Sequence, residues 1–384
     1  MEDYKDLIAI AQFETGLSNF GGDTFREGLE ILIGSLNREA KLNALGQRAL
    51  RERIIGHLKQ RLQVEDWYAR HPEIDEVELL PPLFGVSLPR TGSTALSFLL
   101  ASDPGIRYLR AWESSTPCPP PSTVSGPDPR RGPPEDLVRT AKTKSHTPTG
   151  IDGPMECLDL MALDFRSQMF PAFAMVPAYS DWLMDTDMES TYAYQRRVLK
   201  LLQWGEPVRP WRLKAPAHLL SLPALDKVFP DARFVMTHRD PTEVILSIAT
   251  VYSDIAARFS DELDPHYMGA LNVRMWSEGM RRAIAFRDAG NDHRFYDIHF
   301  RAMHKDPIGQ VRGLYDWLGE TISPAFEANM QAWWEENTAK HDPVAKPDPS
   351  RFGVNLDEVS KLFADYRKRM EQWTAQGAAT SGTA

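Results

Sequence analysis

One short segment constrains the fold of this chain more than any other. An apolar run from Pro82 to Val86 leads into the turn Pro89–Thr94, and an apolar helical pattern follows at once over residues 95–101. This order predicts a strand, a tight turn and a helix. The first N–H groups of a helix have no partner within it and carry the positive end of its dipole, so they bind anions. The segment therefore predicts a phosphate-sized site at the end of a buried strand.

The residue types in this turn suit a phosphate group. Gly92 has no side chain to keep a phosphate away, and Arg90 adds a charged fork of donors. Ser93 and Thr94 add hydroxyl donors. A Walker A loop would have the spacing Gly-x-x-x-x-Gly-Lys-Ser/Thr, whereas here the basic residue precedes the glycine by two. We therefore expect a nucleotide site, but not an ATP or GTP hydrolase.

Charge and cysteine content exclude several classes of protein. The net charge of −9 argues against general nucleic-acid binding, so local basic residues must hold an anionic ligand. The two cysteines, Cys118 and Cys157, cannot form a disulfide framework and favour a reducing compartment. The N-terminus lacks a signal-peptide pattern, and no apolar run approaches the ~20 residues that span a bilayer. We expect a cytoplasmic protein without an integral membrane segment or a nucleic-acid partner.

Apolar periodicity divides the chain into a helical N-terminal part and a mixed part. Helical spacing over residues 1–75 predicts a helical cap over 1–78. From Pro82 onward, short apolar runs alternate with helical segments, and further strands are expected over 210–214, 233–238 and 294–300. This alternation predicts an α/β domain over 79–374, with a parallel sheet covered by helices on both faces.

Two segments interrupt this alternation. Residues 114–154 are rich in proline, which leaves little room for regular structure before about Glu135. Long loops in compact domains are usually functional or disordered, and this one follows the phosphate-turn helix closely, so we expect a flap over the site. The small, polar tail 375–384 is expected to be disordered.

A second anion site is predicted at His238-Arg239-Asp240-Pro241. Arg239 comes where a predicted strand ends, and Ser247 lies two turns along the next helix and can face back toward that end. In a parallel sheet with helices on both faces, ligands lie at the carboxyl ends of the strands. Two anion sites at two such ends suit a nucleotide with phosphates at two positions.

These motifs together resemble the sulfotransferases that depend on 3′-phosphoadenylyl sulfate (PAPS), and the bacterial members above all. The turn Pro89–Thr94 is similar to the family's 5′-phosphosulfate loop. Arg239 and Ser247, eight positions apart, are similar to its 3′-phosphate pair. The segments 213–218, 231–235 and 351–353 also resemble family elements. The resemblance implies the sulfotransferase fold, a P-loop-like parallel sheet flanked by helices. It also implies PAPS as donor and adenosine 3′,5′-bisphosphate (PAP) as product.

The resemblance assigns donor binding to eight residues: Arg90, Thr91, Gly92, Ser93, Thr94, Arg239, Ser247 and Arg351. Sulfuryl transfer is an in-line displacement, in which the protein positions the reactants and neutralises charge. Arg90 would stabilise the leaving phosphate, and Lys214 would contact the sulfuryl group. Simpler roles stay open at this point: an ion pair of Arg239 with Asp240 or Glu243, and an ordinary helical serine at Ser247.

The acceptor hydroxyl needs a general base, for which the sequence offers three candidates. Glu113 comes first, because related sulfotransferases that act on proteins carry a catalytic glutamate in a similar place. His218 follows Lys214 by four positions, and its alternative role is a structural hydrogen bond near a helix N-terminus. Glu156 is the third candidate.

The acceptor itself is indicated only as a class. The stretch from Phe165 to Trp182 is rich in aromatic residues and methionine, as is typical of a core, but part of it is a candidate lining for an apolar pocket. The pair Trp333-Trp334 has the same two interpretations. We therefore expect a small, apolar acceptor with a hydroxyl group, and leave open whether the chain is a monomer or a homodimer.

Other functions compete with this assignment. A P-loop nucleotide kinase would need a Walker lysine and a Mg²⁺-binding aspartate after an apolar strand, and neither is evident. A non-catalytic nucleotide-binding protein would keep the fold without the chemistry. The ten histidines show no His-Glu-x-x-His or other paired spacing, so no metal is predicted.

Overall fold

The computed structural model describes residues 1–132, 150–338 and 347–380, without the side chains of Thr338 and of residues 375–380. The chain divides into two compact units. The first unit comprises Met1–Leu80, Leu109–Val208 and Val251–Met268, and the second comprises Pro81–Tyr108, Arg209–Thr250 and Gly269–Ala384. The helical segment predicted over 1–78 thus belongs to a larger unit that also takes in residues from the middle of the chain.

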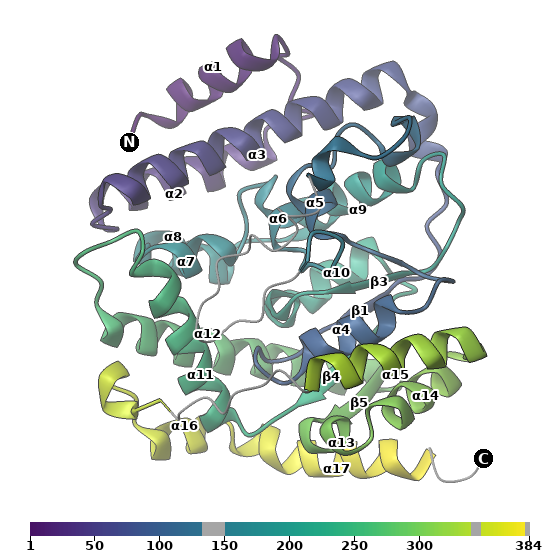
Figure 1. Ribbon diagram of the computed structural model, residues 1–384. Coiled ribbons are helices and arrows are strands. Elements are labelled where there is room, and N and C mark those ends of the chain that lie inside the picture. The colour runs from purple at the N-terminus through teal and green to yellow at the C-terminus, as the bar shows by residue number, and fades with distance from the viewer. Residues whose placement is uncertain (133–149, 339–346, 381–384) are drawn as a thin grey trace. The chain divides into compact units, whose positions relative to one another are not determined.

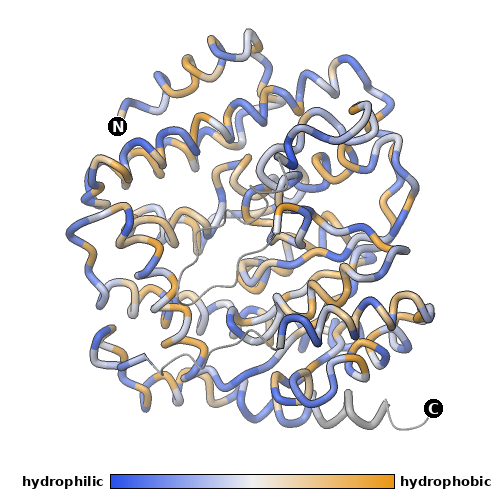
Figure 2. Tube along the Cα trace, viewed as in Figure 1, coloured by the Kyte–Doolittle hydropathy of each residue, from blue (hydrophilic) through white to orange (hydrophobic). Residues whose placement is uncertain are grey.

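The first unit is helical (Figure 1). Its elements are α1 (Tyr4–Thr15), α2 (Thr24–Arg38), α3 (Ala44–Arg70), η1 (Pro72–Glu76), α5 (Ala111–Ser115), η2 (Pro121–Thr123), η3 (Pro129–Arg131), α6 (Leu158–Ala162), α7 (Met169–Phe173), α8 (Pro177–Asp185) and α9 (Glu189–Gln203). The helical spacing predicted for the N-terminal part is confirmed, since Leu29, Leu32 and Leu36 are buried on α2. Figure 2 shows hydrophobic and hydrophilic residues alternating along α2 and α3. Both cysteines of this unit are free and buried.

The second unit contains a five-stranded sheet with the order β2-β3-β1-β4-β5. Its strands are β1 (Leu83–Gly85), β2 (Arg107–Tyr108), β3 (Trp211–Lys214), β4 (Arg233–His238) and β5 (Phe295–His299). All neighbouring strands pair in parallel. The four predicted strands are confirmed, and so is the parallel α/β fold class. The two-residue β2 was not predicted.

Helices follow the strands of this unit. They are α4 (Ser93–Ala101), η5 (Pro216–Leu220), α10 (Leu222–Val228), α11 (Pro241–Ala256), α12 (Pro265–Phe286), η6 (Arg287–Asn291), η7 (Asp292–Arg294), α13 (Phe300–Lys305), α14 (Pro307–Leu318), α15 (Pro324–Thr338), η8 (Pro349–Phe352), α16 (Leu356–Leu362) and α17 (Ala364–Thr380). Asp306 accepts a hydrogen bond from the Gly309 amide at 2.8 Å, so it caps α14 as the sequence Asp306-Pro307 predicts. The helices α11 and α12 each contain residues of both units.

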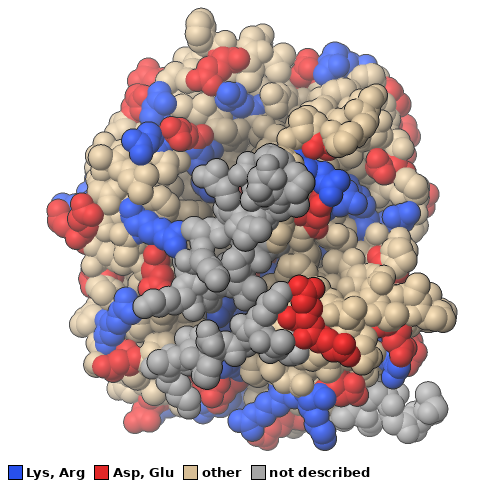
Figure 3. All heavy atoms as spheres, viewed as in Figure 1, with Lys and Arg blue, Asp and Glu red and all other residues tan. Residues whose placement is uncertain are grey.

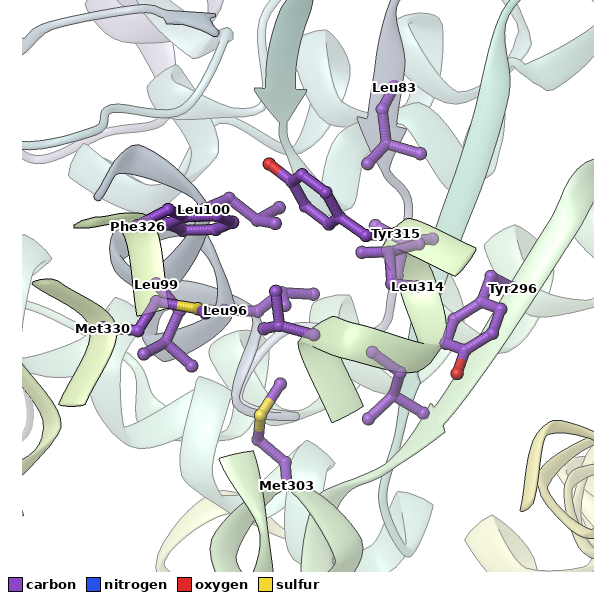
Figure 4. Packing of buried hydrophobic residues seen from close by; sticks show 13 residues of the cluster. Leu83, Leu96, Leu99, Leu100, Tyr296, Met303, Leu314, Tyr315, Phe326 and Met330 are labelled. Carbon is purple, nitrogen blue, oxygen red and sulfur yellow. The ribbon is translucent and has the colours of Figure 1, made fainter. Parts of the chain in front are cut away.

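Alternation along the strands gives the sheet two buried faces. Leu83, Val235 and Tyr296 belong to a cluster with residues of α4, α13, α14 and α15. Figure 4 shows leucines of α4 within this cluster, beside Phe326 and Met330 of α15. The residues adjacent to these three along their strands point to the opposite face, where Phe84 packs edge-on against Phe229 and Phe234 stacks on Phe295.

The strand order indicates where a ligand is expected to bind in this sheet. From β1 the chain passes to β2 at one edge, whereas from β4 it passes to β5 at the other edge. Neighbouring strands whose connections leave in opposite directions open a crevice at their carboxyl ends, where ligands bind in sheets of this kind. Here those strands are β1 and β4, and each is followed by one of the two predicted anion motifs.

Two segments were predicted to lack regular structure. The prediction that the tail is disordered from residue 375 is wrong for residues 375–380, because α17 continues to Thr380. Alanines at 375, 378 and 379 favour a helix, which explains the continuation. Residues 381–384 lie outside the described residues.

The proline-rich segment up to residue 132 contains the two short 3₁₀ turns η2 and η3. The Arg130 guanidinium lies 4.5 Å from the Trp112 ring centroid, and its Nη1 donates to the Thr116 carbonyl at 2.9 Å. Ser122 Oγ donates to the Trp204 carbonyl at 2.6 Å. This part is therefore held by the first unit itself. The predicted flap also includes residues 133–149, which are not described, so it stays a prediction.

Candidate functional site

Three basic residues follow or end three neighbouring strands of the second unit. β1 pairs with β3 on one side and with β4 on the other. Lys214 is the last residue of β3, Arg90 lies in the turn after β1, and Arg239 follows β4. A Cβ on Gly85 would lie 2.9 Å from Lys214 Cγ, so this glycine makes room for the lysine stem. The carboxyl ends of β3, β1 and β4 therefore carry a group of positive charges, at the place where the strand order predicts a ligand site.

The turn after β1 has an unusual backbone. Arg90 and Gly92 both have left-handed φ angles, of 63° and 91°. Glycine adopts such a conformation freely, whereas for arginine it is uncommon and needs support from its surroundings. Since strained residues of this kind gather at ligand sites, the geometry singles out the same turn as the sequence does.

Buried hydroxyl groups fix this turn to β4. Thr91 Oγ1 donates to the Leu88 carbonyl at 2.8 Å and lies 2.6 Å from Thr237 Oγ1. Thr237 in turn donates from its amide and its hydroxyl to Ser87 Oγ, at 2.7 and 2.9 Å. Thr91 is fully buried. Its hydroxyl therefore anchors the turn, while its neighbours Gly92, Ser93 and Thr94 form the helix entrance.

Gly92 is the N-cap of α4, and its left-handed φ of 91° disfavours any larger residue. A Cβ there would also make a tight contact of 3.3 Å with Phe300 Cδ2. Without a side chain at this position, the amides at the start of α4 can approach an anion closely. Ser93 is buried and Thr94 is half-buried within that first turn. The turn and helix start therefore fit a phosphate group.

The two predicted anion motifs form one hydrogen-bonded site. Arg90 Nε donates to Ser247 Oγ at 3.1 Å, and Arg239 Nη1 donates to the Arg90 carbonyl at 3.0 Å. The Arg239 guanidinium also lies 4.5 Å from the Phe300 ring centroid and pairs with Glu243 at 2.9 Å. The ion pair that the sequence left open thus exists beside the contact with the turn. Ser247 faces the strand ends, as its spacing predicts.

A buried charged network lies just before Arg239. His238 Nε2 is 2.7 Å from Asp297 Oδ1, and Asp297 accepts two hydrogen bonds of 2.8 Å from Arg287. Burial alone would raise the pKa of Asp297, but the hydrogen bonds from Arg287 and His238 outweigh it and lower this pKa to about 2. This network fixes the end of β4. This network was not predicted from the sequence, in which His238 is notable only as the residue before Arg239.

The remaining candidates of the second unit lie in different surroundings. His218 lies on η5, fully buried, with its ring edge-on to Phe84 at 5.2 Å between centroids. Burial lowers the pKa of His218 to about 3, so its imidazole is neutral at pH 7. Lys214 is buried at the end of β3. Arg351 is exposed on η8, with its guanidinium 5.1 Å from the Phe352 ring.

Glu113 belongs to the first unit and is fully buried there on α5. Its Oε2 accepts from the Arg110 amide at 3.1 Å, which caps the start of α5, and its Oε1 lies 3.4 Å from Arg110 Nη1. Glu113 therefore has a structural role whatever its chemistry.

Long-range hydrogen bonds position α5. The Met155 amide donates to the Leu109 carbonyl at 2.8 Å, and the Ala111 amide donates to the Gly153 carbonyl at 3.1 Å. These bonds join the segment before Glu113 to the segment before Glu156. Glu156 is half-buried, and its charge adds to the burial that raises the pKa of Tyr252. Two candidate bases thus lie on paired segments of one unit.

The aromatic stretch is mainly core of the first unit. Of its eight large apolar members, six are buried: Phe165, Met169, Phe170, Met175, Val176 and Tyr179. Phe170 stacks on Phe165 and meets Tyr179 edge-on, and the Tyr179 hydroxyl donates to the Phe165 carbonyl at 2.8 Å. Phe173 and Trp182 are half-buried, with the Arg53 guanidinium 4.7 Å from the Phe173 ring centroid and the Arg166 guanidinium 5.5 Å from the Trp182 ring centroid. Trp333 stacks on Phe98 in the second unit.

Surface charge is mixed on the face drawn in Figure 3, where basic and acidic side chains are interspersed. The basic residues at the strand ends therefore act locally. Within the described part of the chain, none of the helices has the length and apolar character to cross a membrane. Over the same residues, no three His, Cys, Asp or Glu side chains gather in a metal-sized group.

Comparisons with known proteins agree with this geometry. The model of the sulfotransferase family matches residues 81–324. The omega-hydroxy-beta-dihydromenaquinone-9 sulfotransferases Stf3 of Mycobacterium bovis and Mycobacterium tuberculosis are 26% identical over 253 residues, which is 62% of this chain and 63% of each relative. The match thus spans less than two thirds of these relatives.

Two solved structures are similar over nearly the whole chain. The sulfotransferase STF9 from Mycobacterium avium has a TM-score of 0.87 and 31% identity, covering 95% of this chain and 96% of its own. The sulfotransferase STF1 from Mycobacterium tuberculosis H37Rv has a TM-score of 0.83 and 29% identity, covering 95% of this chain and all 100% of its own. The turn after β1, the strand order and the family match lead to one conclusion: this chain belongs to the sulfotransferase family.

Proposed function

We propose that this protein transfers a sulfuryl group from PAPS to the hydroxyl of a small, apolar acceptor and releases PAP. The observation that carries the proposal is the hydrogen-bonded set Arg90, Ser247 and Arg239, which joins two anion motifs from separate strands. PAPS carries a 5′-phosphosulfate and a 3′-phosphate, so it needs two anion sites held at a fixed separation. The enzyme would act in the cytoplasm. Its reaction would need no metal ion.

The donor would be held mainly by the second unit. The amides at the start of α4 and the hydroxyls of Ser93 and Thr94 would receive the 5′-phosphosulfate. Arg239 and Ser247 would receive the 3′-phosphate, and Arg351 would approach it from η8. Thr91 would contribute by anchoring the turn through its buried hydroxyl, and not by a hydrogen bond to PAPS.

The reaction would proceed by in-line displacement at sulfur. The acceptor oxygen forms a bond to sulfur while the bond from sulfur to the phosphate oxygen breaks, and PAP leaves. Arg90 would stabilise the charge that develops on this phosphate, and Lys214 would contact the sulfuryl oxygens. Glu113 would take the acceptor proton. His218 is the weaker candidate, because its burial against Phe84 and its lowered pKa suit a packed core residue.

The acceptor class rests on two supports. Phe173 and Trp182 are half-buried beside the aromatic core of the first unit and are our candidates for contact with an apolar acceptor. The two Stf3 relatives are named for a hydroxylated dihydromenaquinone, which is an apolar molecule with a hydroxyl group. We therefore expect a hydroxylated, largely apolar acceptor for this chain as well.

A thermal-shift comparison of PAP, ATP and NAD tests the donor assignment. A ligand that binds only the native state stabilises it by RT ln(1 + [L]/Kd), or ~2.7 kcal/mol at one hundred times Kd. PAP should raise the melting temperature well above the shifts given by ATP and NAD. Equal shifts from ATP and PAP would instead favour a nucleotide kinase. PAP could also stabilise the protein although no PAP is released when the protein is incubated with PAPS and a panel of hydroxylated acceptors. That result would favour a non-catalytic nucleotide-binding protein.

A further inference from the structure

The last helix of the chain contacts both residues that flank Arg239. Tyr366 Oη of α17 lies 3.1 Å from His238 Nδ1. Arg367 Nη2 donates to both carboxylate oxygens of Asp240, at 3.1 and 2.9 Å. Tyr366 is buried. Two consecutive residues of α17 therefore hold the segment around Arg239 from one side, through its neighbours His238 and Asp240.

The other side of this segment is held by the charged network of the sheet. His238 uses its second ring nitrogen to contact Asp297 of β5, which is paired with Arg287. Trp373, two turns after Tyr366 on α17, covers that pair, with the Arg287 guanidinium 3.7 Å from its ring centroid. The end of β4 thus lies between β5 and α17, with little freedom to move.

The contact between Arg367 and Asp240 has the character of a positioning contact. Both side chains are about one-third exposed, at 33% and 42%, so their ion pair adds little to stability. Burial alone would raise the pKa of Asp240, but hydrogen bonds from Thr242 and Arg367 outweigh it and lower this pKa. Asp240 also accepts from the Thr242 amide at 2.9 Å, at the start of α11. One carboxylate thus ties α17 to the turn that carries Arg239.

We infer that Tyr366 and Arg367 of α17 are positioning residues that set Arg239 for the 3′-phosphate of the donor. The inference rests on the proposed function, and it extends the donor site beyond residues 81–324, which the family model matches. Arg239 is the residue that would touch the phosphate, and α17 would act through it. The aim of the Arg239 fork depends on its backbone, which α17 holds through the flanking residues His238 and Asp240.

Calorimetric titration with PAP and with AMP tests this role, because AMP has the 5′-phosphate but lacks the 3′-phosphate. Arg367→Met keeps the side-chain stem and removes the fork, and Tyr366→Phe removes one oxygen. Each should weaken PAP binding about 3- to 10-fold, the worth of one or two hydrogen bonds, and change AMP binding less than about twofold. The matched control is Arg369→Met on the same helix, which breaks the pairs of Arg369 with Asp288 and Asp365. It should leave both affinities unchanged.

The outcomes separate the inference from the proposed function. A wild-type protein that prefers PAP to AMP, with variants that keep the same ratio of the two Kd values, would overturn the role of α17 alone. Equal weakening of both ligands would show a general structural effect and would also overturn it. A wild-type protein with no preference for PAP would overturn the proposed function and the inference together. Tyr366→Phe decides the question even if Arg367→Met does not fold.

Discussion

The candidate residues of the two units are positioned by different means. In the second unit, Arg90 and Arg239 come shortly after strands of the sheet, so a local motif brings each to the strand ends. In the first unit, Glu113 lies on a five-residue helix that is held by hydrogen bonds to residues 151–155. Chemistry at the end of a parallel strand is therefore set by nearby sequence, whereas chemistry on a short helix is set by partners far along the chain.

The largest expected effect tests whether the first unit carries chemistry at all. Glu113→Gln should keep the fold and the PAP affinity, since a glutamine oxygen can still accept from the Arg110 amide. Turnover should fall by ~10²–10⁴-fold, the range typical for loss of a general base. The measurement is single-turnover transfer from PAPS to an accepted hydroxyl compound, beside a titration with PAP.

His218→Ala is the partner variant for this experiment. His218 is fully buried, so its loss should lower stability more than it lowers turnover at saturating substrate. Near-normal kcat in Glu113→Gln, together with lost turnover and intact PAP binding in His218→Ala, would move the base from the first unit to the second.

The next effect sharpens the account of the second unit. Arg239→Ala should weaken PAP binding by ~1.5–3 kcal/mol, which is about 10- to 150-fold, through loss of charged hydrogen bonds to the 3′-phosphate. Because Arg239 also donates to the Arg90 carbonyl, AMP binding should weaken too, by about 2- to 10-fold. Calorimetry with both ligands measures the difference.

Arg233 provides the control for that variant, since it is the exposed first residue of β4, at the opposite end of the strand. Arg233→Ala should leave both affinities as they are. Equal losses of PAP and AMP in Arg239→Ala would remove Arg239 from the 3′-phosphate site and leave it only a role in bracing the turn.

The smallest effect concerns pH. The folded-state pKa of His218, about 3, lies below its ordinary value of 6.5, so the unfolded chain binds the proton more readily. Stability from this residue is therefore lost as the pH falls from about 6.5 toward 3. Between pH 7 and pH 5 the loss should be ~2 kcal/mol, as 1.4 kcal/mol corresponds to one pKa unit.

Urea unfolding of wild type and His218→Gln at both pH values measures this effect. The variant should lose ~2 kcal/mol less than wild type over the same interval, whatever its absolute stability. His266→Gln changes an exposed histidine and serves as the matched control. If His218→Gln loses as much unfolding free energy between pH 7 and pH 5 as wild type does, His218 is accessible to protons in the folded state. It would then return to the list of candidate bases.

Sequence alone predicted the strands that have apolar runs and the turns that follow them. Strand β2 was missed because Arg107-Tyr108 has no such run and pairs with β3 through only two residues. The hydrogen bond between Arg90 and Ser247 joins two motifs that were predicted separately. The spacing of Ser247 from Arg239 was enough to predict that the Ser247 side chain faces the strand ends.

Other features had no local signal. The contacts of Tyr366 and Arg367 with the end of β4 arise from tertiary packing, and no pattern near residue 366 indicates them. The same holds for Phe300, whose ring lies against both Gly92 and Arg239. The pairing of residues 109–111 with 153–155 bridges a proline-rich segment in which periodicity carries no information. Such positions depend on which surfaces meet after the elements have formed.

The left-handed turn at Arg90 and Gly92 has a kinetic consequence. Fixing the backbone of one residue costs about 1–2 kcal/mol of conformational entropy. Here the buried Thr91 hydroxyl and the Arg239 side chain already hold the turn, so that cost is met during folding. An arriving nucleotide would find the amide donors of this turn preorganised. Capture of the donor should then be limited by diffusion and orientation, and differences in affinity between nucleotides should appear in their dissociation rates.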